Sequence, residues 1–124
     1  MFSQENDVGN SYVEYKEHGF WSRDRYISEW IDLIVAEMEP MKSEERWLQP
    51  VIAHWRIQVE VDGGCMSLRL NEFVSDDTKR EMTISLAEKA LTTSTELTRR
   101  TGELFIELLR GKLRTTASSP IDYF

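Results

Sequence analysis

The spacing of the apolar residues limits most strongly how this chain can fold. Between residues 22 and 38 the apolar side chains recur every three or four positions, which is the period of an amphipathic helix. They are Tyr26, Trp30, Leu33, Ile34 and Met38. Ser22 or Asp24 can cap the start of this helix. Pro40 ends it, because the residue before a proline is pushed out of the helical conformation. The pattern therefore predicts a helix that ends just before Pro40.

From residue 53 onward the period changes to two, which is typical of a half-buried strand. The alternating apolar residues are Ala53, Trp55, Ile57, Val59 and Val61. The next residues, Asp62-Gly63-Gly64, suit a tight hairpin turn, since glycine accepts the positive φ that such a turn needs. A return strand over 65–70 would point Met66, Leu68 and Leu70 inward. The sequence therefore predicts a hairpin over residues 53–71.

Two shorter segments carry weaker patterns. Residues 12–15 alternate apolar and polar side chains, and they predict an edge strand. Ser43 can begin a short helix through Leu48, which Pro50 then interrupts. Gly19 to Ser22 leads into the helix that ends before Pro40.

Two more helices are predicted after the hairpin. Residues 75–77 (Ser-Asp-Asp) can cap the first, because their carboxylates suit the positive end of a helix dipole. Its apolar stripe is Met82, Leu86 and Ala90, with Leu91 beside it. The sequence Thr-Thr-Ser-Thr at 92–95 has poor helix propensity and predicts a break. The second helix contains Gly102 as a weak point and ends near Gly111. Its apolar face is Leu97, Leu104, Phe105, Leu108 and Leu109.

The order helix, hairpin, helix, helix indicates an α+β fold. An antiparallel hairpin, extended to three strands if residues 12–15 join it, is expected to pack against three to four helices. The length of 124 residues suits a single domain over residues 1–124. Residues 1–10 and 115–124 are expected to be flexible tails, although the apolar side chains near the C-terminus are able to dock.

Composition and charge narrow the classes of function. The chain has 22 acidic and 15 basic residues, a net charge of −7, whereas nucleic-acid binding relies on an excess of lysine and arginine. No apolar run approaches the 18 or so residues that span a bilayer, and no signal peptide is visible. Cys65 is the only cysteine, so no internal disulfide or thiolate zinc site can form. We expect a cytoplasmic protein that binds neither nucleic acid nor membrane.

The sequence also predicts no catalytic residue, cofactor or metal. His18 and His54 are the only side chains that titrate near neutral pH without a large shift, and neither lies in a nucleophile motif. A two-histidine, one-carboxylate site would need these histidines to meet in space, and their spacing gives no sign of it. Asp76 and Asp77 resemble a ligand pair, but a helix N-terminus explains them as well.

The acidic residues are unevenly distributed. Residues 1–77 carry 16 acidic and 7 basic side chains, a net of −9, and residues 78–124 carry 6 and 8, a net of +2. Such a cluster is either a solvated face or a docking surface for a basic protein. The candidate contact residues are Glu37, Glu39, Glu44, Glu45, Glu72, Asp76 and Asp77. Among the four tryptophans, Trp21 and Trp47 are less clearly placed in the core, and exposed aromatics often anchor interfaces.

Two stretches resemble a known class of protein. They are Gly19-Phe20-Trp21-Ser22 with the helix that follows, and residues 70–76 (Leu-Asn-Glu-Phe-Val-Ser-Asp) leading into 85–91 (Ser-Leu-Ala-Glu-Lys-Ala-Leu). They are similar to small bacterial immunity proteins of polymorphic and contact-dependent toxin systems. The resemblance implies a cytoplasmic inhibitor that binds one cognate toxin domain. The alternatives are a dimeric acidic secretion chaperone or other small adaptor, and a small enzyme that uses His18 or His54.

Overall fold

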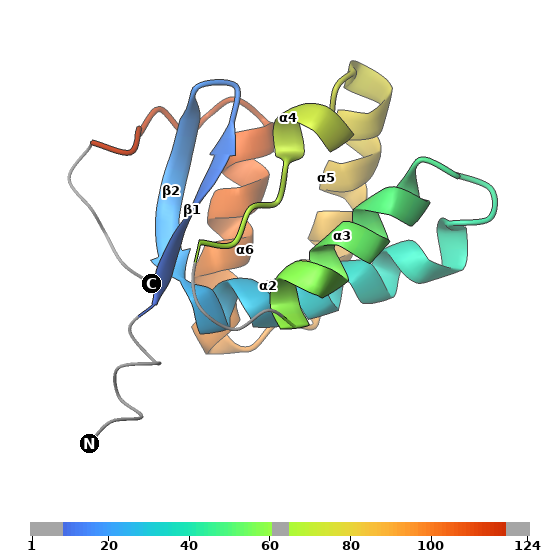
Figure 1. Ribbon diagram of the computed structural model, residues 1–124, viewed down its shortest axis with the longest axis horizontal. Coiled ribbons are helices and arrows are strands. Elements are labelled where there is room, and N and C mark those ends of the chain that lie inside the picture. Colours follow the sequence, from blue (N-terminus) through green and yellow to red (C-terminus); the bar gives the residue numbers. More distant parts are fainter. Residues whose placement is uncertain (1–8, 61–64, 119–124) are drawn as a thin grey trace.

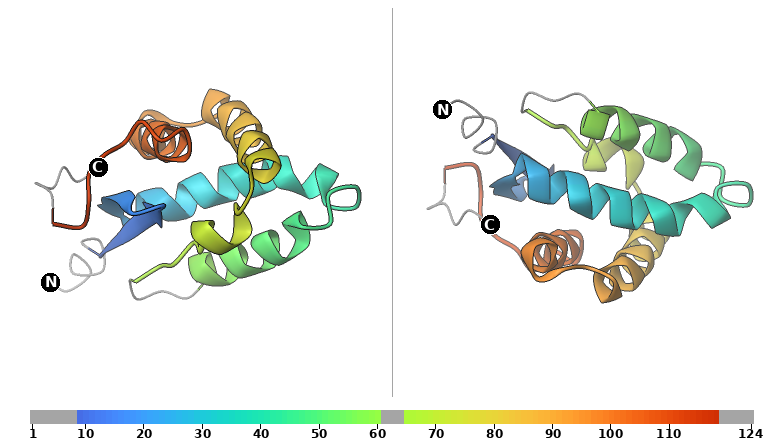
Figure 2. Two further views of the ribbon diagram at one scale, coloured as in Figure 1. Left: turned by 90° about the horizontal axis from the view of Figure 1, so that it is seen from above. Right: turned by 90° about the horizontal axis from the view of Figure 1, so that it is seen from below.

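Helix α2 (Asp24–Met38) lies at the centre of the fold. The computed structural model describes residues 9–60 and 65–118. Helices α3 (Leu48–Glu60) and α4 (Leu70–Phe73) lie on one side of α2, and α5 (Asp77–Thr92) and α6 (Glu96–Leu109) lie on the other (Figures 1 and 2). The buried residues of α2 follow the helical period that the sequence showed: Ile27, Trp30, Ile31, Ile34, Val35 and Met38. The helix and its end before Pro40 are confirmed. The expected reason is wrong, because Glu39 keeps helical angles (φ −52°, ψ −47°) and the chain continues through Pro40 as a short 3-10 helix. Its cap was predicted wrongly, because the N-cap residue is Arg23 and no side chain caps the helix.

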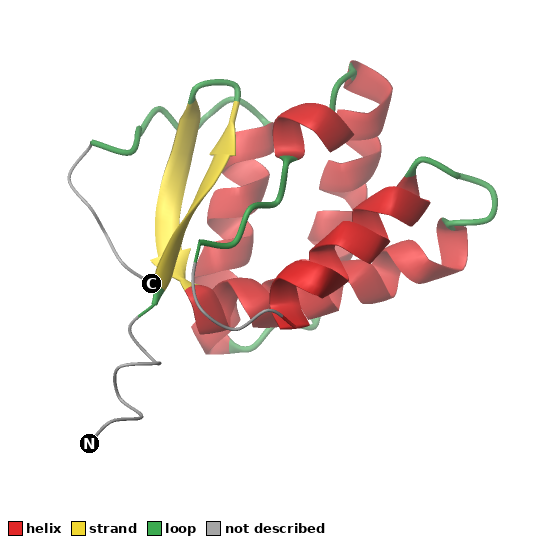
Figure 3. Cartoon of the chain, in the orientation of Figure 1, coloured by secondary structure: helices red, strands yellow, loops and turns green. Residues whose placement is uncertain are grey.

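A two-stranded antiparallel hairpin precedes α2. Strand β1 (Asn10–Tyr15) confirms the strand expected at residues 12–15, and its partner is β2 (His18–Arg23). Within the pair, the Tyr12 and Trp21 rings lie opposite each other with centroids 5.3 Å apart. Within the part of the chain described, this hairpin and its helices form an α+β fold (Figure 3). Residue 10, expected in a tail, begins β1.

The hairpin predicted at residues 53–71 is wrong. Helix α3 (Leu48–Glu60) occupies its first half, and the residues 65–69 that follow are not in a strand. The buried residues of α3 are Leu48, Val51, Ile52 and Trp55, which recur at helical spacing. Ile57, which belonged to the predicted inward stripe, is 53% exposed. The alternation was coincidental, because burial follows one face of the helix. The predicted turn at 62–64 lies outside the described residues.

Helix α3 also replaces the short helix predicted from Ser43. Residues 42–47 form turns, and α3 begins only at Leu48. Pro50 lies in the first turn of α3, where the missing backbone N–H would have had no partner within the helix. This proline therefore lies within the start of a helix and does not interrupt one.

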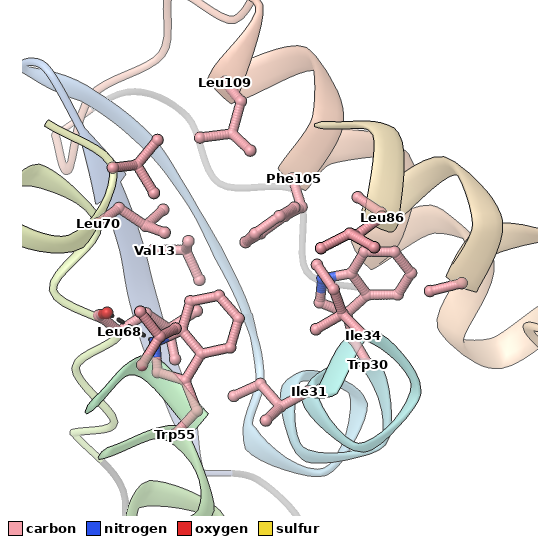
Figure 4. Packing of buried hydrophobic residues seen from close by; sticks show 14 of the residues in the cluster. Val13, Trp30, Ile31, Ile34, Trp55, Leu68, Leu70, Leu86, Phe105 and Leu109 are labelled. Atoms are coloured by element: carbon pink, nitrogen blue, oxygen red, sulfur yellow. Dashed lines mark hydrogen bonds between the residues drawn. The ribbon is translucent and has the colours of Figure 1, made fainter. Parts of the chain in front are cut away.

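Residues 65–69 connect α3 to the rest of the core. Met66 and Leu68 are buried, as the sequence predicted for the inward side chains of this segment. The indole Nε1 of the buried Trp55 donates a hydrogen bond of 2.8 Å to the Leu68 carbonyl oxygen (Figure 4). The Met66 backbone N–H donates to Ser11 Oγ on β1 at 2.8 Å. These two hydrogen bonds connect the irregular segment to α3 and to β1, and each satisfies one of its backbone groups.

The remaining helices are α4 (Leu70–Phe73), α5 (Asp77–Thr92) and α6 (Glu96–Leu109). The two predicted C-terminal helices and the break between them are confirmed. Leu97 is an exception to the predicted apolar face, since it is 53% exposed. Leu86 of α5 and Phe105 and Leu109 of α6 point into the core (Figure 4).

Small and hydroxyl side chains let α6 pack closely on α2 and β2. Gly102 is buried against the ring of Trp30 on α2. One turn away, Thr98 Oγ1 donates to Glu29 Oε1 at 2.8 Å. The buried hydroxyls of Ser22 and Thr101 hydrogen-bond at 3.0 Å. The part of α6 that lies nearest α2 and β2 therefore has little spare volume.

Residues 115–117, expected in a tail, run along β2. Thr115 and Gly19 exchange two hydrogen bonds: the Gly19 N–H donates to the Thr115 carbonyl at 2.9 Å, and Thr115 Oγ1 donates to the Gly19 carbonyl at 2.6 Å. Trp21 Nε1 donates to the Ala117 carbonyl at 3.2 Å. This contact covers part of the outer edge of β2. The remaining predicted tail residues, 1–8 and 119–124, lie outside the described part of the chain.

The turn of the hairpin is a first site for a test of stability. Its two residues, Lys16 and Glu17, have φ values of 50° and 75°, which cost free energy for residues other than glycine or asparagine. We expect Glu17→Gly to raise the free energy of unfolding by about 0.5–1 kcal/mol, measured by urea denaturation. Glu14→Gly removes the same charge from inside β1 and should instead lower it by about 0.5–1 kcal/mol. Equal effects of the two substitutions would contradict this assignment of strain.

Candidate binding surface

Three of the seven acidic candidates lie between the end of α2 and the start of α3, and a fourth lies in the last turn of α2. Glu37 is in the last turn of α2, and Glu39 begins the short 3-10 helix η1 (Glu39–Met41). Glu44 and Glu45 follow in the turns before α3, at the end of the molecule farthest from the hairpin (Figure 1). The residues that cluster in sequence therefore also lie on one projecting connection.

The Glu39 carboxylate forms ion pairs with basic side chains of the same chain. Its carboxylate lies 2.8 Å from Lys42 Nζ and 2.5 Å from Arg56 Nη2 on α3. Hydrogen bonding to Lys42, together with the charge of Arg56, lowers the pKa of the Glu39 carboxyl below its ordinary value. The pair therefore helps to fix η1 against α3. By contrast, no lysine, arginine or histidine nitrogen among the described residues lies within 4.0 Å of the Glu37 or Glu44 carboxylate.

The other three candidates lie around the start of α5. Asp76 is its N-cap residue, and the Asp76 carboxylate accepts a hydrogen bond of 2.8 Å from the Lys79 backbone N–H. This confirms that a helix N-terminus explains the aspartate pair. Asp77 pairs with Arg80 at 3.1 Å. Glu72 on α4 pairs with Arg69 at 2.9 Å, and all three acids are exposed.

Trp47 joins these two acidic groups. Its indole Nε1 donates to Glu45 Oε1 at 3.2 Å, and its ring faces Lys79 Nζ, 5.7 Å from the ring centroid. Lys79 Nζ in turn lies 3.9 Å from Asp76 Oδ2. Glu45 contacts the half-buried ring directly and Asp76 approaches it through Lys79, although the two acids are 31 positions apart in the sequence. We call the residues Glu44, Glu45, Trp47, Asp76 and Asp77 the Trp47 surface.

The two histidines have different neighbours. His54 Nε2 lies 2.8 Å from the Ser67 carbonyl oxygen, and its ring is 5.7 Å from that of Phe73. His18 begins β2 and lines a small cavity with residues of the turn, α5 and α6. Within residues 9–60 and 65–118, no group of three or more histidine, cysteine, aspartate or glutamate side chains is placed to hold a metal ion. Cys65 is exposed.

Sequence reasoning missed the cationic side chains that meet at this cavity. Lys16, Arg80 and Arg110 come from three segments that are far apart in the chain, so no local motif marks them. The only early sign was the change to a net positive charge after residue 77.

Comparison with protein families, with characterised proteins and with solved structures gave no match to this chain. None of the helices described is both long and apolar enough to cross a lipid bilayer.

Proposed function

We propose that this chain is a non-enzymatic binding protein, an immunity protein that neutralises a cognate toxin by forming a stoichiometric complex with it. The observation that carries the proposal is the Trp47 surface. A half-buried tryptophan there donates a hydrogen bond to Glu45 and faces Lys79, whose ammonium lies near Asp76 from a distant part of the chain. Tryptophan is among the residues that contribute most to binding at protein interfaces, above all where surrounding contacts exclude water from it.

The acidic side chains indicate which chemistry the partner should have, namely a basic surface. Glu37 and Glu44 keep carboxylates that no cation among the described residues neutralises within 4.0 Å. They therefore remain available to attract a basic protein and to orient it during encounter. A toxin that acts on nucleic acid has such a basic surface, and carboxylates can occupy the positions that phosphates would take. An inhibitor of this kind would act in the cytoplasm, a reducing compartment in which a free cysteine such as Cys65 persists.

The proposal is tested with Trp47→Ala. We expect this substitution to weaken a 1:1 complex with the partner, captured from lysate of the source cells and purified, by about 30-fold, or about 2 kcal/mol. The measurement is isothermal titration calorimetry with both proteins first shown to be folded. Trp21→Ala is the matched control, because Trp21 is also half-buried but lies on β2 beside residue 117. The Trp21→Ala substitution should change the affinity for the partner less than threefold.

Two results would contradict the proposal. One is a partner whose affinity falls equally in both variants or in neither. The other is a chain that forms a stable dimer, with a mass near twice 14.6 kDa, and that holds its partner in an apolar groove. The second result would favour the secretion chaperone.

A further inference from the structure

A small cavity is lined by residues of the hairpin turn, the first turn of α5 and the end of α6. These parts of the chain lie toward the top of Figure 1. Its volume is about 110 Å³. Four basic side chains line it: Lys16 of the turn, His18 of β2, Arg80 of α5 and Arg110 after α6. Leu108 and Leu109, both buried, form part of its wall. No acidic residue is among the described residues that line it, although the chain as a whole has a net charge of −7.

The lysine and the two arginines that line the cavity retain N–H groups that can donate hydrogen bonds to a ligand. Arg80 uses Nη1 and Nε for Asp77 and Glu81, and Arg110 uses Nη2 for Glu88. A guanidinium group has five N–H donors in a planar fork, so each arginine retains donors beyond these ion pairs. Lys16 Nζ lies 5.3 Å from the centroid of the Tyr15 ring, and no carboxylate of the described residues is within 4.0 Å of it.

We propose that this cavity binds a phosphate group. Lys16, Arg80 and Arg110 approach it from three elements, which suits a compact oxyanion that offers oxygens in several directions. The volume accommodates inorganic phosphate or the phosphate of a small phosphomonoester. The buried leucines reduce solvent on one side, and charge-assisted hydrogen bonds are stronger where water is excluded. The cavity shares no residue with the Trp47 surface, although Arg80 pairs with Asp77 at the border between the two. Phosphate binding does not depend on the proposed function.

The turn makes the site testable without loss of the fold. Lys16 has a φ of 50°, a conformation that asparagine accepts more readily than lysine. Only the backbone N–H of Lys16 bonds to the Asn71 side chain, so Lys16→Asn can keep this contact. The substitution therefore removes one cation from the cavity and leaves the turn intact.

The experiment is a titration of the whole chain with sodium phosphate. NMR of the backbone amides monitors binding, and sodium chloride keeps the ionic strength constant. We expect saturable shifts at residues 16–18, 80 and 108–113, and a Kd that rises about tenfold in Lys16→Asn. Arg99→Gln is the matched control. Arg99 is exposed on α6, about 16 Å along the helix axis from Arg110, and its loss should change the Kd less than twofold.

A parallel titration with phenyl phosphate distinguishes the two sources of the group. Tighter binding than inorganic phosphate, by threefold or more, assigns the site to phosphomonoesters. Equal or weaker binding assigns it to free phosphate. The proposal is overturned if phosphate produces no saturable shifts at these residues, or if Lys16→Asn and Arg99→Gln weaken binding equally. The arginine and lysine residues would then serve only to offset the negative end of the α6 dipole.

Discussion

Reversing three charges, with Glu37→Lys, Glu44→Lys and Glu45→Lys together, is expected to slow association with a basic partner by tenfold or more at low salt. The physical reason is that Glu37 in the last turn of α2 and Glu44 and Glu45 in the turns that follow are close in the chain, where they attract the partner before contact. The association rate should also become less sensitive to salt, because the attraction that salt screens has been removed. Stopped-flow mixing at several salt concentrations measures both effects.

A matched control variant distinguishes the effect of charge at these three positions from the effect of the net charge of the whole chain. Glu14→Lys, Asp32→Lys and Glu96→Lys change the net charge by the same amount at three exposed positions outside the Trp47 surface. We expect association of this control to slow by less than threefold. If both variants slow association equally, only the net charge matters. If the first variant binds as fast as the unmodified chain, the contact surface has been placed wrongly.

Substituting Gly102 with alanine is expected to lower the free energy of unfolding by about 1–3 kcal/mol. A Cβ at this position would lie 2.6 Å from a carbon of the Trp30 ring and 2.9 Å from a methyl carbon of Leu91. Alanine favours a helix over glycine by up to about 1 kcal/mol. The steric effect should outweigh this gain, because the Trp30 side chain is almost completely buried and packs against Phe105. Urea denaturation measures the difference.

The double variant Trp30→Phe, Gly102→Ala tests the cause. Phenylalanine lacks the part of the indole ring that the new Cβ would meet. The double variant should therefore lose at least about 1 kcal/mol less than the sum of the two single variants. Gly111→Ala is a second comparison: its φ of +76° predicts a cost, but a Cβ there would meet no atom within 4 Å. Strict additivity at residues 30 and 102 would rule out the steric explanation.

The sequence predicted the helices well because their apolar spacing survives in the burial pattern. Helix α2 buries residues three and four positions apart, and α5 is capped by Asp76 as its sequence suggested. The fold class was also predicted correctly. Its hairpin was placed at residues 53–71, however, because Gly63-Gly64 is a stronger turn signal than Lys16-Glu17. The real turn uses residues that rarely adopt a positive φ, so composition did not reveal it.

The error at α3 has a similar cause. Alternation from residue 53 matched a strand, whereas the neighbouring pair Val51 and Ile52 already fitted a helix face together with Leu48 and Trp55. A short apolar segment can satisfy both periods, and only the packing partners decide between them. Here the hydrogen bond from Trp55 to Leu68 and the contact of Trp55 with Phe105 favour the helix.

The candidate surface was predictable only in part. The acidic cluster around Pro40 and the ambiguous position of Trp47 were visible in the sequence. The approach of Lys79 and Asp76 to that tryptophan was not, because it depends on how α5 packs against α2. The same holds for the cationic cavity, whose residues come from three separate segments.

Amide hydrogen exchange of the chain, alone and in a 1:1 complex with its purified partner, tests the central claim most directly. If the Trp47 surface is the contact, exchange should slow by tenfold or more at residues 42–49 and 77–80. The exposed face of α6 around Arg99 should exchange at the same rate in both samples. Unchanged exchange at 42–49 and 77–80, with protection elsewhere, would contradict the proposal.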